Sequence, residues 1–122
     1  VKTVREVHRL LVESDSGVGN PLAVGITTKN EINFRAVEAE LKPLLQDRLG
    51  VAVTNGGGGA DVGPTGALGY PTAGLNTDTT EYWNVHHTHA DTVDKINQVD
   101  FRRCTASLAT IAIWASESDI AI

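Results

Sequence analysis

The stretch that decides the fold class runs from LAVGIT (Leu22–Thr27), through a segment with helical spacing, to VAV (Val51–Val53). Its two ends are short, apolar and rich in β-branched residues, as buried strands are. Between them, apolar residues recur at the spacing of one helix face, which predicts a helix over 34–49. These residues are Val37, Leu41, Leu44, Leu45 and Leu49. The order strand, helix, strand indicates an α/β fold.

The predicted helix has capping residues at both ends. Asn33 is the predicted N-cap, because its side-chain oxygen can accept a hydrogen bond from the first turn. Gly50 suits the C-cap, where glycine adopts a left-handed conformation without strain. Pro43 lies inside the pattern and lacks a backbone N–H, so we expect it to kink the helix or to end its first half.

Further elements extend the pattern in both directions. LLVE (Leu10–Glu13) predicts an earlier strand, TAGL (Thr72–Leu75) predicts a later one, and Val62–Leu68 can form one or two helical turns. Asn97 is the predicted N-cap of a final helix. The apolar stripe of that helix consists of Phe101, Cys104, Leu108, Ile111, Ala112 and Ala115. Residues 1–122 are therefore predicted to form a single, partial α/β domain: a mixed β-sheet flanked by helices.

Composition excludes several classes of function. The chain has 122 residues, of which 41% are hydrophobic, enough for the core of one globular domain. Its net charge is -5 and its basic residues are scattered, so no nucleic-acid partner is expected. No apolar run approaches the roughly 20 residues of a membrane span. Cys104, the only cysteine, lies on the apolar stripe and is predicted to be a buried core thiol. The start at Val1 and the absence of Met predict a processed chain or a piece of a longer one.

Two loops are candidates for a functional site. SDSG (Ser14–Gly17) follows the first predicted strand, and a carboxylate at a strand end is where α/β proteins place binding and catalysis. The alternative is a plain polar turn. NGGGGAD (Asn55–Asp61) is rich in glycine but lacks the Lys-Ser/Thr ending of a phosphate-binding loop. It is therefore either a flexible turn or a loop that lets a substrate backbone come close.

VHHTHADT (Val85–Thr92) holds three of the four histidines within five residues. Neutral imidazole is a common metal ligand, so the segment predicts a metal site. If it were extended, His87 and His89 would point to one side and His86 to the other. Asp91 could then accept a hydrogen bond from the outer nitrogen of a ligating histidine. The alternative is a polar loop whose histidines only form hydrogen bonds.

The longer stretch YWNVHHTHADTVDKIN (Tyr82–Asn97) resembles a segment of the M28 family of zinc exopeptidases, in which a histidine is followed four and five residues later by an acidic residue and Thr. This resemblance implies that His87 is a zinc ligand. ESDSG (Glu13–Gly17) is similar to the family's E-x-D-x-G segment and implies that Asp15 binds the other metal of a two-zinc site. The match runs from about Leu10 to Trp114 and is closest to the glutamate-carboxypeptidase-like branch.

Other segments resemble the substrate end of the family's site. Gly58-Gly59-Ala60-Asp61 and the stretch Ala67–Leu75 match its loop, helix and strand. The resemblance implies that Gly58, Gly59 and Asp61 contact a peptide substrate. It also implies a secreted or lysosomal location.

The family's centre also needs an H-x-D motif, a bridging Asp and a Glu-Glu pair, one Glu being the general base. The nine residues before Leu10 hold neither H-x-D nor Glu-Glu. The resemblance therefore implies the C-terminal part of a catalytic domain, with no catalytic residue of its own. Each zinc needs several ligands and the attacking water needs a positioned base. We expect the chain alone to bind zinc weakly and to hydrolyse peptides barely or not at all.

A second hypothesis is that the chain serves assembly instead of catalysis. A partial sheet exposes strand edges, which pair readily with another chain or a second copy of the same chain. A two-fold pairing gives a dimer, and a head-to-tail pairing that does not close gives a filament. Asp15 and His87 are then relics, or hold a metal between subunits. A simple zinc-binding module is a third possibility.

Overall fold

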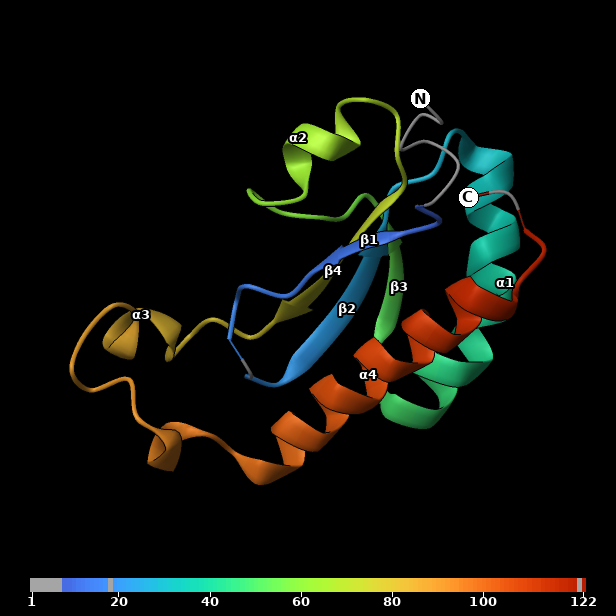
Figure 1. The fold of residues 1–122 in the computed structure, drawn as a ribbon. Helices are drawn as coiled ribbons and strands as arrows, with labels where there is room; N and C mark the ends of the chain where they lie inside the picture. Colours follow the sequence, from blue (N-terminus) through green and yellow to red (C-terminus); the bar gives the residue numbers. More distant parts are fainter. Residues whose placement is uncertain (1–7, 18, 121) are drawn as a thin grey trace.

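A computed structural model of the protein describes residues 8–17, 19–120 and 122. It contains one four-stranded sheet with the strand order β1-β4-β2-β3 (Figure 1). The strands are β1 (Leu11–Glu13), β2 (Pro21–Ile26), β3 (Ala52–Asn55) and β4 (Thr72–Thr77). β1 is parallel to β4 and β2 is parallel to β3, whereas β2 and β4 are antiparallel. The predicted mixed α/β sheet is confirmed.

The register of the strands gives the sheet two different faces. Val24 lies opposite Leu75 on one face, and the glycines Gly25 and Gly74 lie opposite each other on the other face. Glu13 is also opposite Gly74 and therefore belongs to the glycine face. One face thus carries large apolar side chains, and the other presents bare backbone next to a carboxylate.

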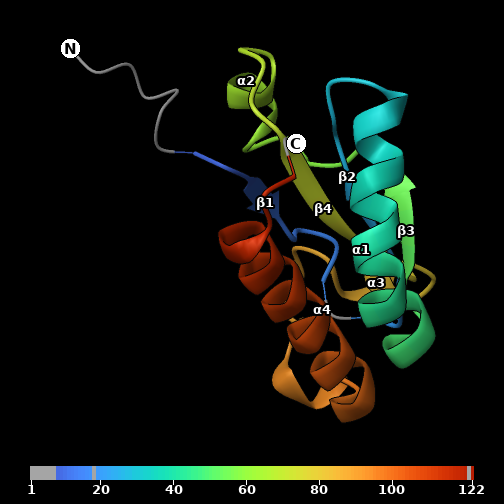
Figure 2. The same ribbon diagram turned by 90° about the vertical axis from the view of Figure 1, so that its right-hand side faces the viewer.

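Two long helices, α1 (Glu31–Leu49) and α4 (Gln98–Glu117), lie side by side on the apolar face (Figure 2). Together with the strands they bury a single core. Its fully buried large side chains include Leu41, Leu45 and Ile111. Burying a side chain of this size contributes about 1.5–3 kcal/mol relative to leaving it exposed. The stability of the fold therefore comes mainly from this helix-covered face.

Helix α1 differs from its prediction at two points. It begins at Glu31, one turn earlier than expected, and its N-cap is Asn30, whose side chain accepts a hydrogen bond from the N–H of Asn33 at 2.9 Å. The helix also continues through Pro43 without ending. Leu41 and Leu45 pack into the core on either side of the proline, and this packing holds both halves of the helix on the sheet. Gly50 ends α1 with φ 66°, as predicted.

Helix α4 begins after Asn97, whose side chain accepts hydrogen bonds from two N–H groups of the first turn, which confirms the predicted cap. Cys104 is buried, also as predicted. The buried face of the helix is shifted from the predicted stripe: Phe101 and Ala112 are exposed. The residues it buries are Cys104, Ser107, Ile111, Trp114 and Ala115. The indole N–H of Trp114 donates a hydrogen bond to the carboxylate of Glu40 on α1 at 2.6 Å. The buried face of α4 therefore includes the side that faces α1.

Three short elements complete the chain: α2 (Gly63–Gly66), α3 (Tyr82–Val85) and the 3-10 helix η2 (Val93–Lys95). The turns predicted over 62–68 correspond to α2. Helix α3 follows β4 after a short loop, residues 78–81. In Figure 1, α3 stands at one end of the molecule, away from the layer formed by α1 and α4. Among the described residues, no helix has the length and apolar character needed to cross a lipid bilayer.

Candidate functional site

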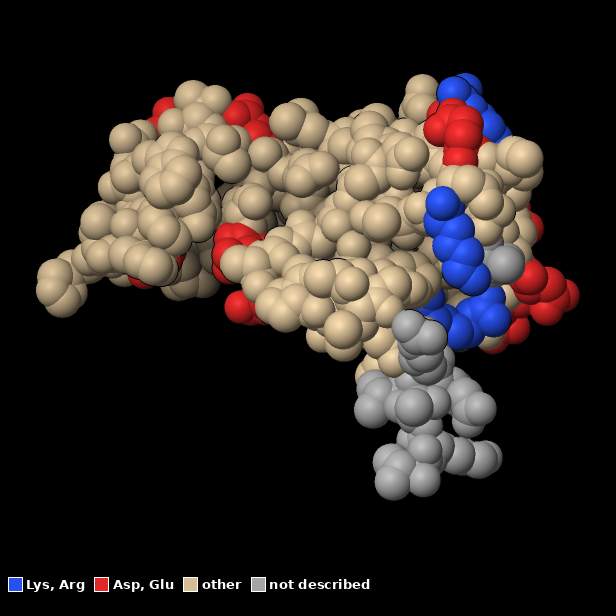
Figure 3. Space-filling model, turned by 90° about the horizontal axis from the view of Figure 1, so that it is seen from above, with Lys and Arg blue, Asp and Glu red and all other residues tan. Residues whose placement is uncertain are grey.

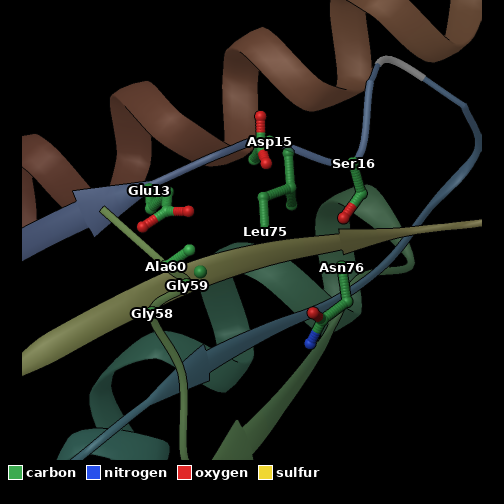
Figure 4. Close-up of a pocket in the computed structure, with 9 residues that line it drawn as sticks. Glu13, Asp15, Ser16, Gly58, Gly59, Ala60, Leu75 and Asn76 are labelled. Atoms are coloured by element: carbon green, nitrogen blue, oxygen red, sulfur yellow. The ribbon is translucent and has the colours of Figure 1, made fainter. Parts of the chain in front are cut away.

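A small pocket of about 160 Å³ lies on the glycine face where β1 ends. Glu13 and Asp15 line it from the β1 side, Gly58, Gly59 and Ala60 from the glycine-rich loop, and Leu75 and Asn76 from β4 (Figure 4). The E-x-D segment and the glycine loop, which are far apart in the sequence, therefore meet at one place. Two acidic residues, Glu13 and Asp15, line this pocket, and no Lys or Arg is among its lining residues.

Glu13 fixes the glycine loop to β1. Its carboxylate accepts hydrogen bonds from the backbone N–H groups of Asp61 and Val62, each at 2.9 Å. Figure 4 shows the carboxylate pointing toward Gly59 and Ala60. A Cβ added at Gly59 would collide with it, so only glycine leaves room for this anchor. This role of Glu13 does not follow from the sequence pattern, in which only its place in the E-x-D-x-G segment marks it.

The same loop packs directly on the backbone of the sheet. A Cβ at Gly57 would collide with the carbonyl oxygen of Gly25, and a Cβ at Gly25 with that of Gly56. Two threonines clamp Gly57: its N–H donates to Thr27 Oγ1 at 3.1 Å, and Thr72 Oγ1 donates to its carbonyl at 2.8 Å. The loop is therefore held closely against the sheet and is not the flexible turn that its composition also allowed.

Asp15 lies in a turn attached to the end of β4. Thr77 Oγ1 donates a hydrogen bond to the carbonyl oxygen of Ser16 at 2.8 Å. Gly17 has φ 71°, a left-handed conformation that favours glycine. The Asp15 side chain is exposed and lines the pocket. The turn thus presents the predicted metal-ligand carboxylate to solvent on a fixed backbone.

The histidine segment is not extended, so the alternation of side chains that an extended segment would have does not occur. His86 ends α3, donating its N–H to the carbonyl of Tyr82 at 2.9 Å, and His87 has φ 55°. The hydroxyl of Thr88 explains the turn: it donates to the carbonyl of Val85 at 2.7 Å and accepts from the N–H of Ala90 at 3.1 Å. Such local hydrogen bonds compete with a strand conformation.

The chain enters α3 through a second local hydrogen-bonded turn. The Asp78 carboxylate accepts hydrogen bonds from the hydroxyl of Thr80 at 2.6 Å and from its N–H at 2.9 Å. The hydroxyl contact in particular holds the pKa of Asp78 below its usual value, because it stabilises the charged carboxylate.

The predicted ligand His87 lies at the end of a row of stacked rings. The rings of His86 and His87 are stacked with centroids 3.8 Å apart, and the ring of Tyr82 is stacked on that of His86 at 4.5 Å. Trp83 meets both Tyr82 and His86 edge-on. We call Tyr82, Trp83, His86 and His87 the aromatic cluster.

Charged side chains are unevenly distributed on the face seen in Figure 3. Lys and Arg gather at the end of the molecule opposite to α3, and the charged side chains visible at the α3 end are all acidic.

The described residues do not form a metal site by themselves. No group of three or more His, Cys, Asp or Glu side chains among them is placed to hold a metal ion. A zinc ion needs three or four ligands, so Asp15 and His87 alone do not suffice. Within the same described part of the chain, the Asp91 carboxylate forms no hydrogen bond with a histidine, and its N–H donates to the carbonyl of Thr88 at 3.2 Å. Asp61 is exposed and contacts Glu13 through its backbone.

Comparisons with known proteins cover nearly the whole chain. No protein-family model matches it. Carboxypeptidase Q from Xenopus laevis is 32% identical over 110 residues, which are 90% of this chain and 23% of that protein. Carboxypeptidase Q from Mus musculus is 29% identical over 92% of this chain and 23% of its own length. The crystal structure of a peptidase M28 precursor from Shewanella amazonensis SB2B matches with a TM-score of 0.87 and 33% identity, over 96% of this chain and 26% of that one. The chain therefore spans about a quarter of the length of these relatives.

Proposed function

Because this chain is homologous to the M28 peptidases over about a quarter of their length, we propose that it is part of a zinc-dependent exopeptidase domain that hydrolyses peptide bonds. The observation that carries the proposal is the meeting of the E-x-D turn, the glycine loop and β4 in one pocket, with the aromatic cluster next to that turn. These are the segments in which the sequence resembles the family's metal and substrate motifs.

In this proposal Asp15 and His87 each supply one ligand to one of two zinc ions. Gly58, Gly59 and Asp61 contact the peptide. The other ligands and the general base come from residues outside these 122, as a two-metal site requires more than two protein ligands. Peptide hydrolysis by the 122 residues alone is expected to be negligible. A secreted or lysosomal location follows only from the resemblance.

The experiment that tests this assignment is equilibrium dialysis of the 122-residue chain in buffered zinc, with zinc per chain read by elemental analysis. We expect weak binding that falls in both His87→Ala and Asp15→Asn. His89→Ala and Asp94→Asn are the matched controls, because each removes the same type of group from an exposed position of the same region. Zinc binding that is equal in all five proteins would contradict the assignment of the ligands.

Two further measurements separate the proposal from its alternatives. Zinc-dependent peptide hydrolysis by the purified chain, lost in His87→Ala, would show that the chain is active without other segments. Sedimentation of the same samples gives the size in solution. A large, zinc-independent assembly with no change in either ligand variant would favour the assembly role instead.

A further inference from the structure

The two predicted metal ligands come from distant parts of the sequence, and Tyr82 is the residue that touches both of their segments. Its hydroxyl donates to the carbonyl oxygen of Asp15 at 3.5 Å, across 67 positions of the chain. Its ring also covers the turn after Asp15: a Cβ at Gly17 would lie 3.5 Å from Cδ2 of Tyr82. The ring therefore lies beside Gly17, where an added Cβ would be in ordinary van der Waals contact with it.

The Tyr82 ring is also connected to His87, through the ring of His86. The Tyr82 ring is stacked on His86 with centroids 4.5 Å apart and planes at 28°. His86 is stacked in turn on His87, at 3.8 Å and 23°. Stacked aromatic rings attract each other beyond the effect of the area they bury. A continuous series of contacts therefore joins the backbone of Asp15 to the side chain of His87.

This series matters because it reaches the Asp15 turn, whereas the hydrogen bonds of Thr88 join near neighbours within the histidine segment only. No residue between 78 and 97 is buried. His87 has φ 55°, the only positive φ of a non-glycine residue among the described part of the chain, and this conformation is costly for a residue with a Cβ. Neighbouring contacts must therefore hold the conformation, and the stack on His86 is the one that also reaches the Asp15 turn.

We propose that Tyr82 is a positioning residue that holds the segments of Asp15 and His87 in one place, and so sets the geometry of the metal site. The inference deepens the proposed function and rests on it for the roles of Asp15 and His87. Trp83 does not share this role: it meets Tyr82 and His86 edge-on, and its side chain is 72% exposed.

The test uses the 15N-labelled 122-residue chain and the amide resonances of Ser16, Gly17 and His87. Tyr82→Ala is expected to move all three together, because both contacts of the ring are lost. Tyr82→Phe keeps the ring and is expected to move Ser16, whose amide belongs to the peptide group that receives the hydroxyl, while His87 stays as in the wild type. Trp83→Ala is the matched control and is expected to leave Ser16 and Gly17 in place.

The metal readout is zinc affinity, followed by titration of the same amides with zinc alone. Groups that orient metal ligands typically change affinity 10–100-fold when removed, so we expect a loss of about tenfold or more in Tyr82→Ala and recovery of most of it in Tyr82→Phe. Unchanged affinity in Tyr82→Ala, in a chain whose zinc binding falls in Asp15→Asn and His87→Ala, would overturn the inference.

The proposed function and this inference fail in different ways. If zinc binding is unchanged in Asp15→Asn and His87→Ala, the ligand assignment is wrong. The joint shift of the Ser16 and His87 amide resonances in Tyr82→Ala then still decides whether Tyr82 holds the two segments together. If Ser16 and Gly17 stay in place in Tyr82→Ala, the inference is wrong whatever the zinc result. Should Tyr82→Ala unfold the chain, the Ser16 resonance in Tyr82→Phe decides: movement supports the inference and no movement overturns it.

Discussion

The layer formed by α1 and α4 and the segment from 78 to 97 are held in place by different forces. The helical layer buries large side chains such as Leu41, Leu45 and Ile111 against the sheet. The segment 78–97 contains no buried residue. It is held by hydrogen bonds between near neighbours, such as Thr88 to Val85, and by the stacked rings of the aromatic cluster.

The region that stabilises the fold is therefore not the region that carries the predicted ligand His87. Burial of apolar side chains supplies most of the free energy of folding, whereas exposed local hydrogen bonds contribute little. Segments with few buried contacts open at low free-energy cost, and binding residues are often found on them. His87 lies on such a segment, while Asp15 lies on a turn tied to β4. One predicted ligand is thus fixed by the body of the protein and the other by its own neighbours and by Tyr82.

The largest effect is expected from the helical layer. Leu41→Ala should lower the free energy of unfolding by about 2–5 kcal/mol, because the side chain is fully buried and its removal leaves a cavity. Urea denaturation of the wild type and variant measures this change. Leu44→Ala is the control on the same helix: its side chain is 37% exposed, and we expect a distinctly smaller loss. Equal losses in both variants would mean that burial against the sheet is not what stabilises this layer.

A polar anchor should have an intermediate effect. Glu13→Ala leaves the N–H groups of Asp61 and Val62 without their acceptor, and because Asp61 is exposed and Val62 half-buried, we expect a cost of about 0.5–1.5 kcal/mol. Glu38→Ala removes an exposed ion pair with Arg35 and is expected to cost about 0.5 kcal/mol or less. Hydrogen exchange of residues 57–62 should also accelerate in Glu13→Ala. A stable loop with unchanged exchange would show that the glycine packing alone holds it.

The sequence predicted the helical layer better than the candidate site. Strands and long helices follow from apolar periodicity, so the sheet, Gly50, Asn97 and the burial of Cys104 were all confirmed. The start of α1 was wrong because two asparagines lie three residues apart and periodicity does not distinguish which one caps the helix.

The histidine segment had no such periodicity to guide a prediction. Its conformation depends on the hydroxyl of Thr88 and on ring contacts with Tyr82, and neither follows from an alternation of apolar and polar residues. The role of Glu13 depends on a contact with a loop some 50 positions away, which a single sequence does not reveal. The motifs could be located by sequence, but their mutual arrangement required the fold.

The pH dependence of stability should be smaller and belongs to the helical layer. Burial raises the pKa of the Cys104 thiol above its ordinary value of 9.0, because the thiolate is poorly solvated there. A folded-state pKa above the unfolded one means that the contribution is fully present below pH 9 and is lost as pH rises through the folded-state pKa. Urea denaturation from pH 7 to pH 10 should therefore show a steeper decline for the wild type than for Cys104→Ala. Parallel curves would contradict this.

The smallest effect on the global free energy of unfolding is expected in the histidine segment. Substitutions there distinguish local stability from global stability. Since His87 is exposed with φ 55°, His87→Ala and His87→Gly should each change the global free energy of unfolding by about 0.5 kcal/mol or less. Locally the two should differ, because glycine avoids roughly 1 kcal/mol of the cost that alanine incurs in this conformation. The amide of Asp91, which closes the turn onto the Thr88 carbonyl, should then exchange about fivefold more slowly in His87→Gly than in His87→Ala. A global change well above 0.5 kcal/mol in either variant would mean that the segment unfolds together with the helical layer. The two regions would then form one cooperative unit that holds both predicted ligands.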